Sequence, residues 1–398
     1  MTTTQRFPGL DSLRFFAALF VVIGHVPMTQ AAVNLPAPAW SAAFFRGAHA
    51  VCFFFALSGF LITYLLLAER ERTGGIDVRR FYLRRVCRIW PLYFAVVAGG
   101  LVFYRLLLPR LGIEYPVAYS LSTALLLYTL FLPNLMNSLY RVGGILNPLW
   151  SIGLEEQFYL AWAPLLKKVR DRLPALCALV LAGSFALFLL NEADVLGGGR
   201  AHYFFAQLKF HFMAVGGLWA WAVYRHRDRL LALPLFRGRA VRLALLALLV
   251  EHYFVGRLAR QAVVAEVLQL LLYGWLIVEV GVNPRRLVRL ANPVCEYLGR
   301  ISYGIYMLHM PVVYAAAELF RRTRWWQGAS GADEALYLAA FYAIAVGGTI
   351  AAAAASYHWF EQPFLRLKER FGGTPIATPV AADADSVTLP IASADAAP

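Results

Sequence analysis

Residues 53–67 read FFFALSGFLITYLLL, a stretch without a charged side chain. Comparable apolar runs occupy residues 15–23, 268–278 and 339–355. The longest of these runs approach the length of about 20 residues that an α-helix needs to cross a lipid bilayer. They predict membrane-spanning helices, because a soluble fold could not bury so many long apolar segments.

The overall composition favours the same interpretation. Hydrophobic residues make up 60% and charged residues 15% of the 398 residues, whereas soluble domains average roughly 45–50% and about 25%. We therefore expect an all-α fold, a polytopic bundle of membrane helices. The net charge of +14 does not indicate nucleic-acid binding, because the basic residues cluster between apolar runs and form no basic–aromatic module.

Basic clusters predict which ends of the helices face the cytoplasm, where Lys and Arg are enriched. The largest cluster is interpreted as one loop and contains Arg70, Arg72, Arg79, Arg80, Arg84, Arg85 and Arg88. The others are Lys167, Lys168, Arg170 and Arg172; Arg225, Arg227, Arg229, Arg237, Arg239 and Arg242; Arg285, Arg286 and Arg289; and Arg366, Lys368 and Arg370. Alternation between these markers predicts about ten crossings of the cell inner (plasma) membrane, with both termini cytoplasmic. Three further basic residues, Arg321, Arg322 and Arg324, are an exception, since they would lie outside.

The predicted crossings lie near residues 12–28, 47–68, 90–108, 149–166, 174–191, 207–224, 241–255, 263–282, 296–320 and 335–360. The apolar stretch 119–133 does not fit the alternation and is short, so we expect it to be re-entrant or interfacial. Residues 1–372 are expected to form the transmembrane domain. Residues 373–398 are expected to be a disordered cytoplasmic tail, because they contain few large apolar side chains to offset the entropy of ordering.

The cysteines indicate neither disulfides nor a metal site. Cys52, Cys87, Cys177 and Cys295 are far apart, and none belongs to a CxxC motif or has a histidine at metal-ligand spacing. We therefore expect no bound metal and no permanently bound cofactor.

The first predicted helix carries two ionisable residues, Arg14 and His25. Their spacing of eleven residues corresponds to almost three helical turns and a rise of about 16 Å, so both lie on one face. Ionisable groups inside a membrane are energetically costly and are usually functional. Arg14 is near the helix end and could instead extend into the interface. Neutral His25 could act as a general base towards a hydroxyl group, although a hydrogen bond to a neighbouring helix is the alternative.

Two adjacent carboxylates, Glu155 and Glu156, open another apolar span within the sequence WSIGLEEQFY, residues 150–159. Adjacent helical residues point about 100° apart, so the two side chains cannot share one face. One could orient His25 or a substrate hydroxyl while the other caps the helix start, although both could be interfacial caps. We select Glu155 as a candidate catalytic residue, and Glu156, Trp150 and Ser151 as candidates for substrate binding.

A pair of arginines, Arg85 and Arg88, is spaced i, i+3 and therefore lies on one side of a helix. Such a pair suits bidentate recognition of phosphates, although cytoplasmic positive charge alone would also explain it. Residues 301–311, ISYGIYMLHMP, place a polar stripe on a later helix. The stripe argues for a cavity, with hydrogen bonding between helices as the alternative. Its members, taken as candidates for substrate binding, are Ser302, Tyr303, Tyr306 and His309.

Together these segments resemble acyltransferase family 3, the membrane O-acyltransferases that include O-antigen acetylases, Nod-factor acetylases and macrolide acyltransferases. The resemblance covers about residues 7–365. The matching motifs are GLDSLR at 9–14 with His25, FFALSGF at 54–60, residues 81–91 with both arginines, residues 149–159, residues 298–311, and Ser356, Tyr357, Glu361 and Pro363. The sequence departs from the family at Ser12, where Gly is frequent, and at residues 50–52, where Gly-Val-Asp is common.

The resemblance implies transfer of an acyl group, commonly acetyl from acetyl-CoA, to a hydroxyl of a carbohydrate or glycosylated acceptor. Arg14 and His25 are implied to be essential. We expect Arg85 and Arg88, with Arg14, to hold the phosphates of acyl-CoA, and His25 to act as the general base. Direct transfer and a transient acyl-enzyme both remain open. The alternative is a proton-coupled transporter of a small molecule or lipid-linked sugar, since such carriers also bury His, Arg and Glu in helical bundles.

Overall fold

A computed structural model describes residues 7, 9–37, 47–258, 260–323 and 332–370. Throughout these residues the regular structure is helical, without a β-strand. The tail predicted at 373–398 lies outside the described residues, as does Arg324. The longest helices are α1 (Leu10–Ala32), α3 (Gly47–Thr73), α4 (Val78–Val102), α8 (Leu149–Val169), α9 (Leu173–Glu192), α11 (Phe210–Ala232), α14 (Ala262–Gly281), α16 (Ser302–Thr323) and α17 (Ala332–Ala355).

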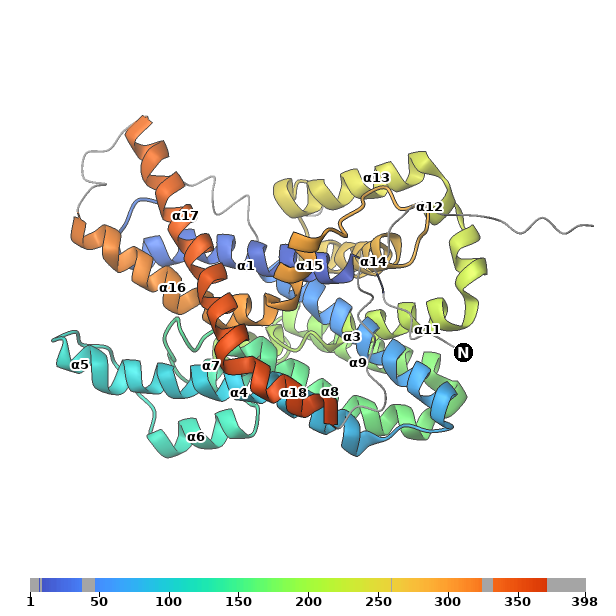
Figure 1. Ribbon diagram of the computed structural model, residues 1–398, viewed down its shortest axis with the longest axis horizontal. Helices are drawn as coiled ribbons and strands as arrows, with labels where there is room; N and C mark the ends of the chain where they lie inside the picture. The colour runs from blue at the N-terminus through green and yellow to red at the C-terminus, as the bar shows by residue number, and fades with distance from the viewer. Residues whose placement is uncertain (1–6, 8, 38–46, 259, 324–331, 371–398) are drawn as a thin grey trace, which may run out of the picture.

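Shorter helices join the long ones or extend them. They are α5 (Leu108–Arg110), α6 (Leu121–Thr129), α7 (Pro133–Leu139), α10 (Arg200–Ala206), α12 (Pro234–Arg237), α13 (Arg239–Val250), α15 (Pro293–Arg300) and α18 (Gln362–Arg370), with π-helical turns at Phe103–Leu107, Glu251–Val255 and Ser356–Glu361 and a 3₁₀ turn at Arg170–Arg172. In Figure 1, α1 and α4 run roughly horizontally and α16 slopes downwards from the left, with α5 and α6 at the left of the molecule and α12 at the right.

Six helical segments in the described residues are long and apolar enough to cross a membrane. They are Leu10–Ala32, Gly47–Thr73, Val78–Arg110, Leu173–Glu192, Ala262–Gly281 and Asp333–Leu367. The predicted total of about ten crossings is therefore not confirmed. The other four predicted spans are helical but shorter or more polar: α13 is only 12 residues long, and α8 carries Glu155 and Glu156. Helix α6, at the stretch predicted not to cross, has 9 residues, a length of about 14 Å.

The structure corrects two predicted boundaries. The seven arginines predicted to form one loop lie in helices instead: Arg70 and Arg72 are in the last turn of α3, and the arginines from Arg79 to Arg88 are in α4, which begins at Val78. The Asp77 side chain caps this helix by accepting a hydrogen bond from the Arg80 backbone N–H at 2.9 Å. That bond holds the pKa of the Asp77 carboxyl below its ordinary value.

The second correction concerns the helix predicted at 296–320. It is divided into α15 and α16 at Ile301, so that Ser302 begins a new helix. Pro293 is the first residue of α15. Its missing N–H costs nothing there, because the first N–H groups of a helix have no partner within the helix. The break lies immediately before the polar stripe, which begins at Ser302.

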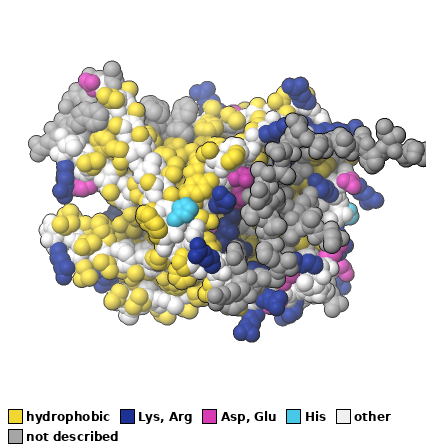
Figure 2. All heavy atoms as spheres, in the orientation of Figure 1, with side chains coloured by type: hydrophobic (Ala, Val, Ile, Leu, Met, Phe, Trp, Pro, Cys, Tyr) yellow, Lys and Arg dark blue, Asp and Glu magenta, His cyan; other side chains and the backbone are white. Residues whose placement is uncertain are grey.

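Helix ends that the sequence predicts on one side of the membrane meet in the structure. The Arg70 side chain at the end of α3 donates a hydrogen bond to the Leu166 carbonyl at the end of α8. The Arg242 guanidinium of α13 donates to Glu279 at the end of α14 at 2.6 Å. At these two places, basic residues that the sequence assigns to one side of the membrane lie together. Figure 2 shows hydrophobic side chains over much of the left of the molecule, with Lys and Arg frequent at its edges and at the right.

Two glycines bring α3 and α11 into backbone contact. A Cβ added at Gly59 would lie 2.0 Å from the Met213 carbonyl oxygen, and one added at Gly216 would lie 2.0 Å from the Ala56 carbonyl oxygen. Small residues permit this close approach between membrane helices. The crossing fixes the orientation of α3 immediately beside Ser58.

Candidate active site

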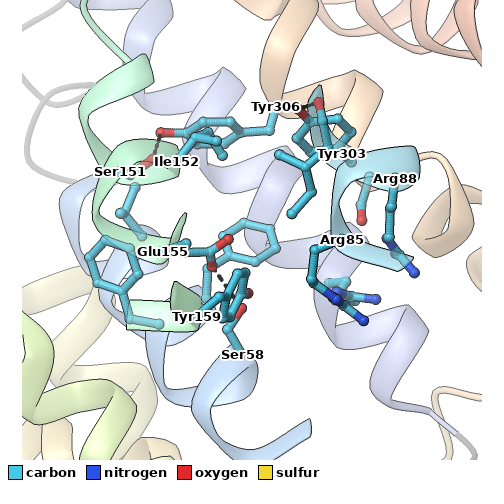
Figure 3. Close-up of a pocket in the computed structure, with 15 residues that line it drawn as sticks. Ser58, Arg85, Arg88, Ser151, Ile152, Glu155, Tyr159, Tyr303 and Tyr306 are labelled. Atoms are coloured by element: carbon cyan, nitrogen blue, oxygen red, sulfur yellow. Dashed lines mark hydrogen bonds between the residues drawn. The ribbon is translucent and has the colours of Figure 1, made fainter. Parts of the chain in front are cut away.

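A cavity lies between five helices, α1, α3, α4, α8 and α16. Its empty volume is about 640 Å³, including its open mouth. Figure 3 shows Arg85 and Arg88 on one side, Ser58, Glu155 and Tyr159 facing them, and the two tyrosines of α16 beyond. The polar lining residues are Arg14, Ser58, Arg85, Arg88, Ser151, Glu155, Tyr159, Ser302, Tyr303 and Tyr306.

Three guanidinium groups, from Arg14, Arg85 and Arg88, line one wall. The Arg85 guanidinium carbon lies 5.7 Å from the centroids of both the Phe81 and Tyr159 rings, which hold it in place. Its Nε is buried and has no hydrogen-bond partner in the described part of the chain. Clustered positive charges repel one another, so this wall is suited to an anionic ligand that would accept the unused N–H groups.

The opposite wall carries a carboxylate held by a hydroxyl group. The Ser58 Oγ donates a hydrogen bond of 2.7 Å to the Glu155 Oε1. The neighbouring Glu156 points elsewhere, and its Oε2 accepts a hydrogen bond of 3.1 Å from the Trp90 indole N–H. Only Glu155 of the two lines the cavity, as the angle of about 100° between adjacent helical side chains requires.

Tyrosines of α16 form the far wall. The Tyr306 hydroxyl and the Ser151 Oγ share a hydrogen bond of 2.6 Å, and the Tyr303 hydroxyl donates to the Ile89 carbonyl at 2.7 Å. These bonds fix α16 against α8 and α4. They also fix the position of the polar stripe relative to Glu155.

His25 and His309 lie next to each other but do not line the cavity. Their ring centroids are 4.8 Å apart, and the His309 ring lies 5.7 Å from that of Tyr306, which does line it. The His25 Nδ1 is 2.8 Å from the Val21 carbonyl oxygen. The two histidines thus continue the polar stripe beyond the far wall, about 16 Å along α1 from Arg14.

The structure therefore brings together eight of the twelve predicted site residues and leaves Trp150, Glu156, His25 and His309 outside the cavity lining. Trp150 packs edge-on against Phe55, with ring centroids 5.9 Å apart. Ser58 and Tyr159 also line the cavity. They were not predicted as site residues, although both lie inside the motifs quoted above. For Tyr159 the signal was available, because it follows Glu155 by four residues and so shares its helix face.

Comparison with known proteins assigns the chain to a family. The family model described as an acyltransferase domain matches residues 7–357. The chain belongs to this acyltransferase family. It is 24% identical over 325 residues to the O-acetyltransferase OatA of Staphylococcus aureus (strain NCTC 8325 / PS 47), a match that covers 79% of this chain and 51% of that relative.

Two further relatives match shorter segments. The putative peptidoglycan O-acetyltransferase YrhL of Bacillus subtilis (strain 168) is 32% identical over 200 residues, covering 46% of this chain and 28% of that protein. The peptidoglycan O-acetyltransferase OatA of Listeria monocytogenes is 26% identical over 163 residues, covering 39% and 23%. The chain spans about half the length of the first relatives it matches. No solved structure gives a significant match.

Proposed function

We propose that this chain is a membrane-embedded O-acyltransferase that moves an acetyl group from acyl-CoA to a hydroxyl of a cell-envelope carbohydrate. The family membership and the names of the relatives, which include peptidoglycan O-acetyltransferases, support this class of reaction. A peptidoglycan-type glycan is the first acceptor to test. The enzyme is proposed to lie in the inner membrane with both termini in the cytoplasm, where acyl-CoA is made.

The arginine wall is the proposed binding site of the donor phosphates. Arg14, Arg85 and Arg88 line one cavity, and Arg85 has a buried N–H without a partner. Guanidinium groups recognise phosphates through paired hydrogen bonds, which are stronger than neutral ones. Arg14 lies in the second turn of α1, and Arg85 and Arg88 lie about 10 and 15 Å along α4 from its start; both helices are proposed to begin on the cytoplasmic side.

The spacing of Arg14 and His25 is the observation that carries the proposal. The Arg14 guanidinium, which lines the cavity, and the His25 imidazole lie on one face of α1, about 16 Å apart along the helix axis. In acyl-CoA, the extended pantetheine arm likewise separates the phosphates from the thioester. A donor held by its phosphates at the arginines could therefore extend past Glu155 and Tyr306 and present its acyl carbon near His25.

The proposed reaction uses His25 as general base. Because the Val21 carbonyl oxygen only accepts hydrogen bonds, the His25 Nδ1 carries the proton and its Nε2 offers a lone pair. His25 takes the proton of the acceptor hydroxyl while the oxygen forms a bond to the acyl carbon. The carbon–sulfur bond then breaks and the sulfur leaves with the electron pair, taking up the proton to give the thiol. Glu155, held by Ser58, orients the bound donor or acceptor.

Release of CoA thiol by the purified protein in lipid nanodiscs tests the proposal. With acetyl-CoA and soluble peptidoglycan fragments, we expect thiol release that depends on the acceptor and is reduced at least 100-fold in His25→Ala, the usual scale for loss of a general base. Substrate movement across vesicles without thiol release would contradict an acyltransferase. An acyl adduct on the protein, trapped with labelled donor alone, would select the acyl-enzyme route over direct transfer.

A further inference from the structure

A second group of buried polar side chains lies where α14 packs against α3 and α11, apart from the cavity described above. Glu266, Gln269 and Tyr273 of α14 are all buried, and their spacing of i, i+3 and i+7 places them on one face of that helix. The Lys209 ammonium, just before α11, pairs with the Glu266 Oε1, and the His211 Nε2 lies 2.8 Å from the same oxygen. None of these residues lines the cavity.

Several polar atoms of this group have no hydrogen-bond partner among the described residues. They are the Gln269 Oε1, the Tyr273 hydroxyl and the hydroxyl of Tyr253, a buried residue of the π-helical turn that follows α13. Both hydrogen bonds to Glu266 reach its Oε1, so its Oε2 can accept a further one. Buried polar groups are rarely left unpaired, because their lost hydration is then not recovered.

Aromatic rings surround these unpaired atoms. The Tyr273 ring centroid lies 5.5 Å from that of Phe53 in α3 and 6.0 Å from that of Phe212 in α11. The Tyr273 hydroxyl also interacts electrostatically with Tyr253 and Glu266, which places the three side chains in one neighbourhood. Rings with a few convergent polar groups are typical of sites for small ligands.

The same group lies beside the proposed general base. On α1, the Phe20 ring centroid is 5.0 Å from that of Tyr253, and Phe20 precedes His25 by five residues, about 8 Å along the helix. On α3, a Cβ added at Gly47 would lie 4.0 Å from the His25 Nδ1, and Phe53 follows Gly47 by less than two turns. A ligand held by this group would therefore lie near His25.

We propose that Tyr253, Glu266, Gln269 and Tyr273 form a binding site for the hydroxyl groups of the carbohydrate acceptor, which we call the α14 site. This inference rests on the function proposed above. Sugar hydroxyls both donate and accept hydrogen bonds, so they can donate to the Glu266 Oε2 and the Gln269 Oε1 and accept from the two tyrosine hydroxyls. Lys209 compensates the buried charge of Glu266.

The position of the α14 site along the helix agrees with an acceptor outside the cytoplasm. Glu266 lies about 6 Å and Tyr273 about 16 Å from the start of α14. The basic cluster after α14 predicts that its other end faces the cytoplasm. A cell-envelope glycan would then enter from the start of α14, while the arginine wall holds the donor at the cytoplasmic end of α1.

Tyr273→Phe tests the α14 site, because it removes a hydroxyl that has no partner among the described residues. With acetyl-CoA and a soluble peptidoglycan fragment, we expect the KM for the fragment to rise about tenfold, the scale of one lost hydrogen bond. The kcat and the KM for acetyl-CoA should stay within twofold of the wild type, and the unfolding temperature should not fall. Tyr128→Phe in α6 is the matched control, since that hydroxyl is also buried without a described partner; all three constants should be unchanged.

An unchanged KM for the fragment in folded Tyr273→Phe would overturn the assignment, and it is the result expected if the α14 site holds only water. An equal rise with Tyr128→Phe would also overturn it. If Tyr273→Phe does not fold, Gln269→Leu replaces it, with the same expected rise and the same contradicting result.

Titration calorimetry of the fragment without acetyl-CoA separates this proposal from the proposed function. Binding that is about tenfold weaker in Tyr273→Phe, with no thiol release by the wild type, would support the α14 site and contradict the reaction. Thiol release by the wild type, with equal fragment binding by both proteins, would contradict the α14 site and support the reaction. A wild type that does not bind the fragment contradicts the α14 site.

Discussion

At the scale of single residues, the arginine wall depends on geometry as well as charge. Arg85 lies between two aromatic rings, at 5.7 Å from each centroid. Its planar guanidinium suits both this position and a bidentate phosphate contact, whereas a lysine ammonium suits neither. The identity of this residue should therefore matter even when its charge is kept.

Substitution Arg85→Lys tests this point. We expect the KM for acetyl-CoA to rise about tenfold, equivalent to about 1.4 kcal/mol of donor binding, with a smaller change in kcat. Arg80→Lys is the matched control, because Arg80 is on the same helix but exposed and paired with Asp77. Equal KM values for the wild type and Arg85→Lys would exclude Arg85 from the donor site.

Most of these residues could be identified from the sequence, but their neighbours could not. Glu155 and Glu156 are the same type of residue at adjacent positions, so the sequence does not distinguish them. Which of them faces the cavity depends on how α8 is rotated against α3 and α4, a property of packing. The contact between His25 and His309 likewise joins residues 284 positions apart in number, and nothing in either local motif specifies it.

At the scale of helices, α3 and α11 make a close backbone contact next to Ser58. A Cβ at Gly59 would meet the Met213 backbone at 2.0 Å, so neither helix could keep its position. Ser58 immediately precedes Gly59 in α3. A shift of α3 would therefore also displace the hydrogen bond that Ser58 donates to Glu155.

Gly59→Ala should therefore destabilise the fold by about 1–3 kcal/mol, the range for overpacking, and lower the unfolding temperature in detergent. Gly183→Ala in α9 is the control, because an added Cβ there meets nothing within 4 Å. That variant should be as stable as the wild type or more so, since Ala is favoured over Gly in a helix. Equal unfolding temperatures for the two variants would show that the crossing is looser than described.

A buried ion pair joins α13 to α14. The Arg242 guanidinium donates to the Glu279 carboxylate at 2.6 and 3.0 Å, and Asn283 and the Leu287 backbone N–H donate to the same carboxylate. Arg242→Ala would leave this carboxylate buried without its counter-ion, at a cost of about 3–5 kcal/mol. Thermal unfolding measures the loss; Glu318→Ala, which removes an exposed pair, should leave the unfolding temperature unchanged. A stable Arg242→Ala variant would contradict the structural role of the pair.

Helix boundaries show where sequence patterns are insufficient. The apolar stretch predicted a helix from residue 90, yet α4 begins at Val78. Arginines are compatible with helix, and Asp77 supplies a cap, so a charged segment read as a loop forms the first turns. The break between α15 and α16 falls at Ile301, where no proline or glycine would let the sequence predict it. The break follows from the packing of each helix.

At the scale of the whole molecule, the topology that the basic clusters predict can be tested by labelling from each side of the membrane. The segment around Asp194 should face outwards and the segment around Arg237 the cytoplasm, and both residues are exposed. In a Cys295→Ser background, a membrane-impermeant maleimide should label Asp194→Cys in intact cells and Arg237→Cys only after the membrane is opened. The other three cysteines are buried and should not react. Labelling of both positions from one side would contradict the predicted topology.

We propose that the cavity between α1, α3, α4, α8 and α16 supports acyl transfer to carbohydrate. The most direct test is mass spectrometry of a soluble peptidoglycan fragment after incubation with isotope-labelled acetyl-CoA and the purified protein in nanodiscs. We expect one labelled O-acetyl group per modified sugar with the wild type and with Arg80→Lys, and at least a 100-fold lower yield with Glu155→Gln, the scale of a lost polar contact to the reacting groups. Unlabelled glycan with the wild type, or equal labelling by Glu155→Gln, would contradict it.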